Sequence, residues 1–367
     1  MQRRQFNRYL STLLLTAALP SYAFAAGEAR YASACADKDQ QHWLIVFNYH
    51  GKELARHPLA SRAHQVLTHP TKPWVFVVAR RPGQYLLGFD LNTGEQVASL
   101  TAAAGKDFCG HMQISANGRY LYTTENLSLT SEGFIGVRDI AANFEQIKSI
   151  SSAGIGPHQL LLNQAGDTMV VANGGIHTRD RVKLNLETMQ SNLSYIDLAS
   201  GSVKQQVALD SEHFQLSIRH IAINQRDQVL IAMQYQGAMS DQVPLVATHT
   251  LGEKAVSYLS IPMEEFYQLK QYCGSACFDK SGDIAAISAP KGDRILFWDV
   301  ANNTYLSSSK VRDGCGIAQD SQVQSFIISS GRGKVYQINP VSGEKQTLLS
   351  NKTIQWDNHL AGVGLAG

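Results

Sequence analysis

The sequence of 367 residues predicts an all-β protein, a seven-bladed β-propeller whose last blade is closed by strands from both ends of the chain. The first observation behind this prediction is a repeat: an apolar run, a polar turn and a second apolar run recur seven times. Successive starts lie 47, 47, 62, 55, 40 and 44 residues apart. A period of roughly 40 to 50 residues, with several strands in each unit, is typical of propeller blades. The repeats start at His64, His111, His158, His220, Ser275, Cys315 and His359.

The second observation is turn chemistry at fixed places in the repeat. Asn117-Gly118, Gly166-Asp167 and Arg226-Asp227 each separate two apolar runs, as in a hairpin. A second turn begins with an Asx residue and ends four residues later with Gly or Asn, which accept the left-handed conformation. It begins at Asp90, Asp197, Asp299 and Asn339. We interpret these turns as structural, joining the third and fourth strands of a blade.

The third observation is that the two ends of the chain complete one another. Residues 30–36, 42–48 and 53–59 have the pattern of three strands without an inner strand, and residues 356–363 offer one lone strand. Joined together they make a seventh blade, which leaves no open sheet edge.

Between the ends, the blades follow in order. The first contains predicted strands at 65–68, 74–79, 85–90 and 96–100. Blades three and four carry insertions, at 174–192 and 237–245, and residues 263–271 have the pattern of one or two helical turns.

The N-terminus predicts export. Arg3-Arg4 followed by Phe6 and Leu10 resembles a twin-arginine signal, and an apolar stretch leads to a small-x-small site at Ala23-Phe24-Ala25. We therefore expect residues 1–25 to be a signal peptide and 26–367 to be a single propeller domain in the periplasm. The alternative is a basic, apolar start to a cytosolic helix. No later segment has 18 consecutive apolar residues, so we expect no transmembrane segment in the mature chain, and a monomer.

Charge and cysteine content exclude some functions. The formal charge is +2, and without the three arginines of the first 25 residues it would be −1, which gives no support to nucleic-acid binding. Five cysteines cannot all pair, and we interpret them as ordinary buried thiols, with a zinc site as the weaker alternative. They are Cys35, Cys109, Cys273, Cys277 and Cys315.

Candidate site residues follow from the topology. In an antiparallel blade, the start of the innermost strand and the end of the second strand lie on the same face of the disc. The histidines that start five repeats should therefore surround the central opening, joined by polar side chains from the second-strand ends and by His177 from the first insertion. Neutral imidazoles suit iron, copper or zinc. The candidate metal ligands are His111, His158 and His220, then His64, His359 and His177. The candidate ligand-orienting residues are Asn126, Asn173, Arg219 and Gln236.

The structural alternative is that each histidine only ties its strand to a neighbouring blade. The sequence contains none of the common catalytic or cofactor-binding motifs that we considered. The chain has no Gly-x-Ser-x-Gly elbow, no Cys-x-x-Cys-His haem attachment, no Gly-x-Gly-x-x-Gly and no P-loop.

Several motifs, in their order along the chain, resemble one family. They are Gly154-Ile155-Gly156-Pro157-His158-Gln159, Val171-Ala172-Asn173-Gly174-Gly175-Ile176, Leu184-Asn185-Leu186-Glu187-Thr188-Met189, Ser217-Ile218-Arg219-His220, Gln234-Tyr235-Gln236-Gly237, Asp313-Gly314-Cys315-Gly316 and Trp356-Asp357-Asn358-His359. Together they resemble the exported propeller family catalogued as domain of unknown function 1513, over about residue 31 to the C-terminus. The resemblance implies a periplasmic role in iron or other metal acquisition, beside imelysin-type and di-haem oxidoreductase-like proteins as partners. A wider similarity to YVTN-type propeller lactonases and the methylamine dehydrogenase heavy subunit concerns the fold.

Three functions remain open on the sequence. The leading hypothesis is a metal-binding or partner-docking protein that uses the histidine-lined face. The second is an enzyme, a lactonase-like hydrolase or an oxidoreductase subunit, which would need a general base or metal-bound water there. The third is a scaffold without a small ligand, which recruits other proteins.

Overall fold

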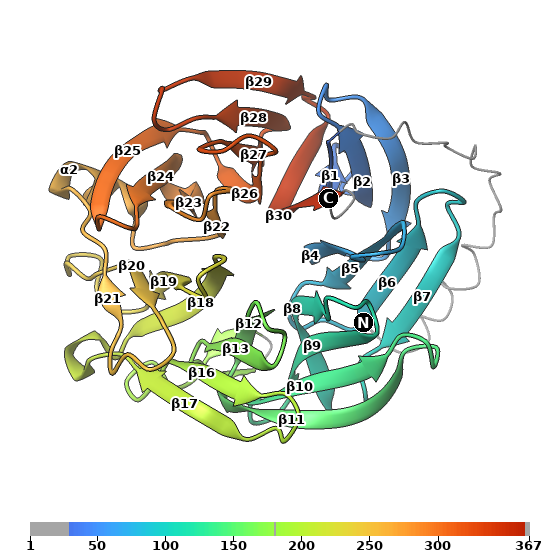
Figure 1. Cartoon of the computed structure of the whole chain (residues 1–367), viewed down its shortest axis with the longest axis horizontal. Helices are drawn as coiled ribbons and strands as arrows, with labels where there is room; N and C mark the ends of the chain where they lie inside the picture. Colours follow the sequence, from blue (N-terminus) through green and yellow to red (C-terminus); the bar gives the residue numbers. More distant parts are fainter. Residues whose placement is uncertain (1–28, 180, 364–367) are drawn as a thin grey trace.

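The structure is a computed structural model that describes residues 29–179 and 181–363. Seven four-stranded antiparallel sheets stand around a central axis like the blades of a propeller (Figure 1). In six sheets the strands follow one another in chain order from the axis to the rim. The predicted all-β, seven-bladed propeller is therefore confirmed.

The first three blades contain the following strands. Blade one has β4 (Ala63–Thr68), β5 (Trp74–Ala79), β6 (Tyr85–Asp90) and β7 (Gln96–Thr101). Blade two has β8 (Lys106–Ile114), β9 (Tyr120–Leu127), β10 (Glu132–Asp139) and β11 (Glu145–Ile155). Blade three has β12 (Pro157–Leu162), β13 (Thr168–Asn173), β16 (Asn192–Asp197) and β17 (Val203–Ala208).

The next three blades are built in the same way. Blade four has β18 (Leu216–Ile223), β19 (Val229–Tyr235), β20 (Val246–His249) and β21 (Ser257–Tyr258). Blade five has β22 (Ala276–Phe278), β23 (Ile284–Ala289), β24 (Arg294–Asp299) and β25 (Thr304–Lys310). Blade six has β26 (Gly314–Gln319), β27 (Phe326–Ser330), β28 (Lys334–Ile338) and β29 (Lys345–Ser350).

The seventh blade joins the two ends of the chain, as the sequence predicts. Its innermost strand β30 (Ile354–Val363) pairs with β1 (Arg30–Asp37), followed by β2 (His42–Asn48) and β3 (Glu53–Leu59). An ion pair between Arg62 and the buried carboxylate of Asp357 links this blade to the first. Closure therefore depends on both main-chain pairing and a charged contact across the first blade boundary.

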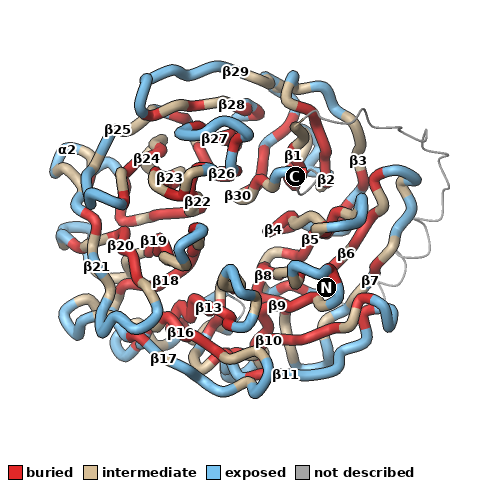
Figure 2. The backbone as a smooth tube through the Cα atoms, viewed as in Figure 1, coloured by how far each residue is buried: buried red, intermediate tan, exposed pale blue. Residues whose placement is uncertain are grey.

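The core lies between the blades. Second strands such as β5 (WVFVVA) and β23 (IAAISA) are buried along nearly their whole length, because a neighbouring blade covers each of their faces. Rim strands such as β11, by contrast, are mostly exposed (Figure 2). A strand covered on both sides is recognised by a continuous apolar run rather than by alternation, which explains the pattern seen in the sequence.

The Asx turns have the structural role predicted for them. The Asp90 carboxylate accepts hydrogen bonds from the backbone N–H groups of Asn92 and Thr93, at 2.8 and 3.2 Å, and Gly94 has a φ of +75°. The turn that begins at Asn339 repeats this arrangement. These residues close loops between the third and fourth strands, far from the axis.

The insertions contain the remaining elements. The insertion in blade three forms the hairpin of β14 (Thr178–Arg179) and β15 (Val182–Lys183). The helical segment predicted at 263–271 contains α2 (Met263–Phe266) and the 3-10 turn η2 (Tyr267–Leu269). Two further 3-10 turns are η1 (Ser211–His213) and η3 (Pro290–Gly292). None of the helices in the described ranges is long and apolar enough to cross a membrane.

All five cysteines are free thiols, and four of them are fully buried. Burial raises the pKa of each thiol to about 12, so the uncharged form dominates near neutral pH. The predicted signal peptide, residues 1–25, lies outside the described residues.

Candidate metal centre

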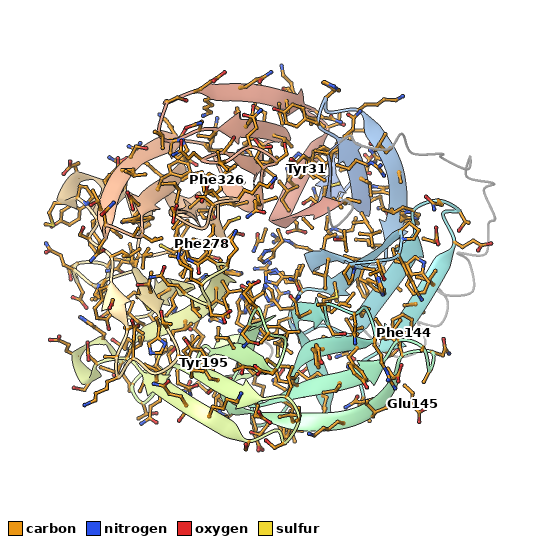
Figure 3. All side chains as sticks on the ribbon, in the orientation of Figure 1. Tyr31, Phe144, Glu145, Tyr195, Phe278 and Phe326 are labelled. Carbon is orange, nitrogen blue, oxygen red and sulfur yellow. The ribbon has the colours of Figure 1, made fainter. Side chains whose placement is uncertain are left out.

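Five histidines reach the axis from five different blades. Each belongs to the innermost strand of its blade, and the blades are one, two, three, four and seven (Figure 1). Figure 3 shows nitrogen-bearing side chains gathered at the centre of the ring. We call this group the histidine cluster; its members are His64, His111, His158, His220 and His359. The chemistry at the axis is therefore assembled from positions nearly 300 residues apart in the chain.

A local irregularity lies at the same place in each of these strands. The register of β12 against β13 shifts between Pro157 and Gln159, which leaves His158 as the extra residue. In β18 the corresponding extra residue is Arg219, next to His220. Comparable shifts occur beside the other three histidines. A bulge bends a strand and changes the direction of its side chains, so the bulges explain how rings from five strands turn toward a common point.

Hydroxyl groups compensate the backbone groups that the bulges leave without a ladder partner. Thr124 Oγ1 accepts a hydrogen bond from the His111 backbone N–H and donates to the His111 carbonyl, at 3.3 and 3.1 Å. Ser33 donates to the His359 carbonyl at 2.6 Å. A buried backbone polar group that lacks a partner is costly, and these contacts hold the histidine backbones in place.

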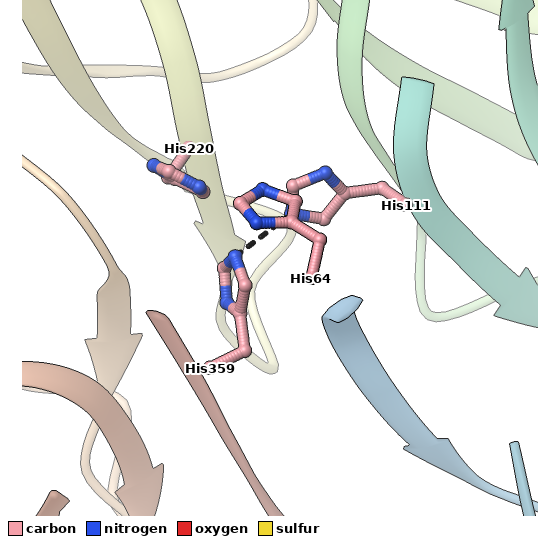
Figure 4. A group of neighbouring side chains, drawn as sticks. All are labelled: His64, His111, His220 and His359. Carbon is pink, nitrogen blue, oxygen red and sulfur yellow. Dashed lines mark hydrogen bonds between the residues drawn. The ribbon is translucent and has the colours of Figure 1, made fainter. Parts of the chain in front are cut away.

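The imidazole nitrogens lie within a few ångströms of one another. Four of the histidines each have one ring nitrogen within 4.8 Å of the corresponding nitrogens of the other three; they are His64, His111, His220 and His359 (Figure 4). The Nε2 atoms of His111 and His359 are 3.2 Å apart, as are those of His158 and His220. The rings of His64 and His111 meet edge to face, with centroids 4.7 Å apart.

These distances fit either of two arrangements. An N–H···N hydrogen bond between two neutral rings brings the nitrogens to about 3 Å. Two nitrogens bound tetrahedrally to one ion, each at about 2.0–2.1 Å, are about 3.3 Å apart. The close pairs therefore already have the separation of two ligands of one metal. The wider separations, up to 4.8 Å, would have to shorten by roughly 1.5 Å.

His64 distinguishes between these arrangements. Its side chain is 4% exposed, and neither ring nitrogen has a hydrogen-bond partner among the described residues. The backbone makes room for this ring, since Gly110 has a φ of +100° and a Cβ there would lie 2.7 Å from His64 Cδ2. A buried polar atom without a partner is costly and calls for an explanation, such as an ion. His64 thus fits a cluster that binds a metal.

The electrostatics of the cluster keep its rings neutral. Burial, and then the neighbouring His359 and His111, hold the pKa of His64 well below its usual value. Burial likewise depresses the pKa values of His111, His158 and His220, with further effects from nearby imidazoles, and lowers that of His359 to about 4. Neutral imidazole is the form that coordinates metals, so no proton has to be displaced at neutral pH.

The structure does not bring the remaining predicted residues to the cluster, with one exception. His177 Nε2 contacts the Leu129 carbonyl at 2.9 Å, and Gln236 contacts Lys183. Asn126 accepts a hydrogen bond from the Cys109 thiol at 3.1 Å. The Asn173 amide bonds to Ser152 and Asn192, within its own and the preceding blade. The exception is Arg219, which lines the same cavity as three of the clustered histidines.

That cavity has a volume of about 200 Å³ and is lined by His64, His158 and His220, among others. Three further arginines line this cavity. Arg80 and Arg81 follow β5, and the ends of second strands are expected to face the central opening. The structure adds that they line the same cavity as the histidines. Arg181 belongs to the insertion, whose fold has no sequence signature.

Fold and site together define a class: a β-propeller with a central histidine cluster that could bind a metal. Residues 57–363 match the family described as "Protein of unknown function (DUF1513)", and the chain belongs to this family. Among solved structures, the chain is similar to hydrazine synthase from Kuenenia stuttgartiensis, with a TM-score of 0.58 and 12% sequence identity over 86% of this chain and 94% of that one. At that identity the likeness concerns the fold. No curated protein matches the sequence.

Proposed function

We propose that this protein is an exported, periplasmic propeller that binds a transition metal ion, iron, copper or zinc, in its histidine cluster and serves metal acquisition. The observation that carries the proposal is His64, which is buried within the cluster and has no partner for either ring nitrogen among the described residues. The other imidazoles supply nitrogen donors around it, within 4.8 Å of one another. The twin-arginine pattern at residues 1–25 and the family resemblance support the location and the role in acquisition.

The donor set limits the choice of metal. The ligand group contains imidazoles and no carboxylate. Carboxylate and carbonyl oxygens suit magnesium, calcium and manganese, whereas imidazole suits zinc, copper, iron and nickel. Because affinity rises along the first row from iron to copper and falls again at zinc, we expect copper to bind most tightly in vitro. The ion that the protein binds in the cell then depends on which metals are available there. The family resemblance favours iron.

Metal analysis of exported, untagged protein tests the proposal. We expect close to one metal ion per chain, or reconstitution to that level after iron, copper or zinc is added. The paired variant His111→Ala/His220→Ala should lose the ion, whereas the matched control His177→Ala should keep it, since His177 lies outside the cluster. Less than about 0.1 metal per chain, with no gain on reconstitution, would contradict metal binding and favour the ligand-free scaffold.

Partners and catalysis need separate tests. Imelysin-type and di-haem oxidoreductase-like proteins are the proposed partners in the periplasm, and pull-down from periplasmic extract with the exported chain tests them. The enzyme alternative predicts turnover of lactones or redox dyes that disappears in His158→Ala while folding is kept. No contact of the described residues favours that alternative over binding.

A further inference from the structure

The cavity beside the histidine cluster is strongly basic. Four arginines line it: Arg80, Arg81, Arg181 and Arg219. Among the lining residues within 29–179 and 181–363, none is a carboxylate. Four guanidinium groups around one space of about 200 Å³ repel one another unless a negative charge lies between them.

Arg219 is a buried arginine without a described counter-charge. It is 6% exposed, and in the part of the chain that the structure describes its guanidinium makes no hydrogen bond or ion pair, with Nε among the buried atoms that lack a partner. A guanidinium group is charged at neutral pH in proteins, so Arg219 is a buried cation. Proteins rarely bury a charge without pairing it. None of the described residues therefore supplies a counter-charge for Arg219.

The positive field extends beyond the four arginines. Burial, followed by Arg219, Lys291 and Arg81, lowers the pKa of Lys183 on the neighbouring hairpin. Burial and then Arg62 and Arg181 lower that of Arg80. Asp357, whose charge acts on Arg80, is already paired with Arg62. The described residues of the lining thus do not balance the positive charge around the cavity.

We propose that this cavity is a binding site for a small oxyanion, a di-carboxylate or a phosphate, held by the guanidinium groups of Arg219 and Arg81. The planar fork of arginine matches both of these anions in bidentate fashion. At about 30 Å³ per water, the cavity has the volume of roughly six or seven waters, which is room for an anion of this size and too little for a long acyl chain.

The site also lies beside the proposed metal centre. His64, His158 and His220 line the same cavity, so a bound anion would have an oxygen facing the cluster. If the cluster holds a metal ion, as proposed above, the anion would offer that ion an oxygen ligand. This part of the inference rests on the proposed metal binding. The anion site itself does not require the metal, because Arg219 needs a counter-charge in either state.

Calorimetric titration of metal-depleted protein tests the anion site without depending on the metal. The probes are succinate and inorganic phosphate, at constant ionic strength set with sodium chloride, and their ranking distinguishes the carboxylate source from the phosphate source. We expect saturable 1:1 binding of at least one probe. Arg219→Gln should weaken it by roughly 10- to 100-fold, the effect of losing hydrogen bonds to a charged partner. Arg81→Gln, whose side chain is more exposed, provides a second variant if Arg219→Gln folds poorly.

The control is Arg119→Gln, which removes an exposed arginine on the turn before β9 and should leave binding unchanged. Binding that is absent for both probes, or that is equal in wild type and both cavity variants, overturns the anion site. Repeating the titration on metal-loaded protein separates the two proposals. Tighter anion binding there supports a shared site, whereas metal uptake with no anion binding leaves the metal centre standing and removes the anion.

Discussion

Replacing His64 by leucine should stabilise the metal-free protein and reduce the further stability that it gains from bound metal. In the metal-free protein His64→Leu removes two buried nitrogens that lack partners. Each such group costs about 1–3 kcal/mol, and a hydrophobic replacement of similar volume costs less than about 1.5 kcal/mol in packing. The two nitrogens together cost about 2–6 kcal/mol, so after the packing cost the metal-free variant should unfold with a free energy at least about 0.5 kcal/mol higher than wild type.

Added metal should stabilise the variant less than it stabilises wild type. An ion at 100 times its dissociation constant stabilises the native wild type by about 2.7 kcal/mol. Losing one ligand weakens affinity at least tenfold, or about 1.4 kcal/mol, so the metal-induced gain in His64→Leu should fall to about 1.3 kcal/mol or less. Urea unfolding with and without zinc measures both quantities in the same samples.

The matched control is His57→Leu. His57 is also buried, with an unpartnered Nε2, but its ring stacks on Phe89 at 4.1 Å and lies outside the cluster. This variant should keep the full metal-induced gain. If His64→Leu destabilises the metal-free protein by more than about 1 kcal/mol and responds to zinc as wild type does, His64 is a structural residue and the reasoning is wrong.

Gly110→Ala places a Cβ 2.7 Å from the His64 ring, so it should lower the metal content of the protein. The control is Gly105→Ala, which is also at positive φ but has nothing within 4 Å of the added atom. It should only destabilise the fold, by about 1–2 kcal/mol. Metal-free protein should lose stability as pH falls below 6.5, because His57 and His359 have pKa values of about 4 in the folded state and bind protons more readily when unfolded. Each of these histidines should lower the free energy of unfolding by about 1.4 kcal/mol per pH unit between pH 6.5 and 4. Urea unfolding at several pH values measures this loss. Arg62→Ala leaves the Asp357 carboxylate buried without its partner and, because Arg62 itself is 42% exposed, should cost about 1–3 kcal/mol at pH 8, less than a fully buried pair. The gentler Asp357→Asn should cost less, and equal losses in a thermal melt would contradict the assigned role of this pair in closing the ring.

Much of the fold could be predicted from local patterns. The strands of the seventh blade at 42–48 and 53–59 and the second strand of blade one at 74–79 have the bounds expected from the sequence. These strands are continuous apolar runs bounded by turn residues, so periodicity and turn chemistry suffice to find them. The two-ended closure was predictable because the first three strands lacked an inner partner.

The candidate site was predictable only in part. The position of five histidines at the start of the repeat indicated that they would face the axis. Their close approach depends on bulges that shift the register at His158 and beside His220, and a bulge of this kind has no signature in the sequence. The amides of Asn126 and Asn173 are bonded to neighbouring side chains, since a second-strand end can equally face the next blade.

Arg219 has a different role from that of the amides. Its place as the extra residue of a bulge turns it toward the cavity, next to His220. A sequence cannot show whether an arginine of this kind has an acidic partner across the ring. Only the assembled blades reveal that the described residues lining this cavity include no carboxylate.

X-ray absorption spectroscopy at the metal edge, on exported and untagged protein, shows whether the histidine cluster holds a metal ion. We expect about one ion per chain, surrounded by three to five imidazole nitrogens at about 2.0–2.1 Å, with the multiple scattering typical of histidine rings. An ion coordinated mainly by oxygen or sulfur, or the absence of any ion after reconstitution with iron, copper and zinc, would contradict it.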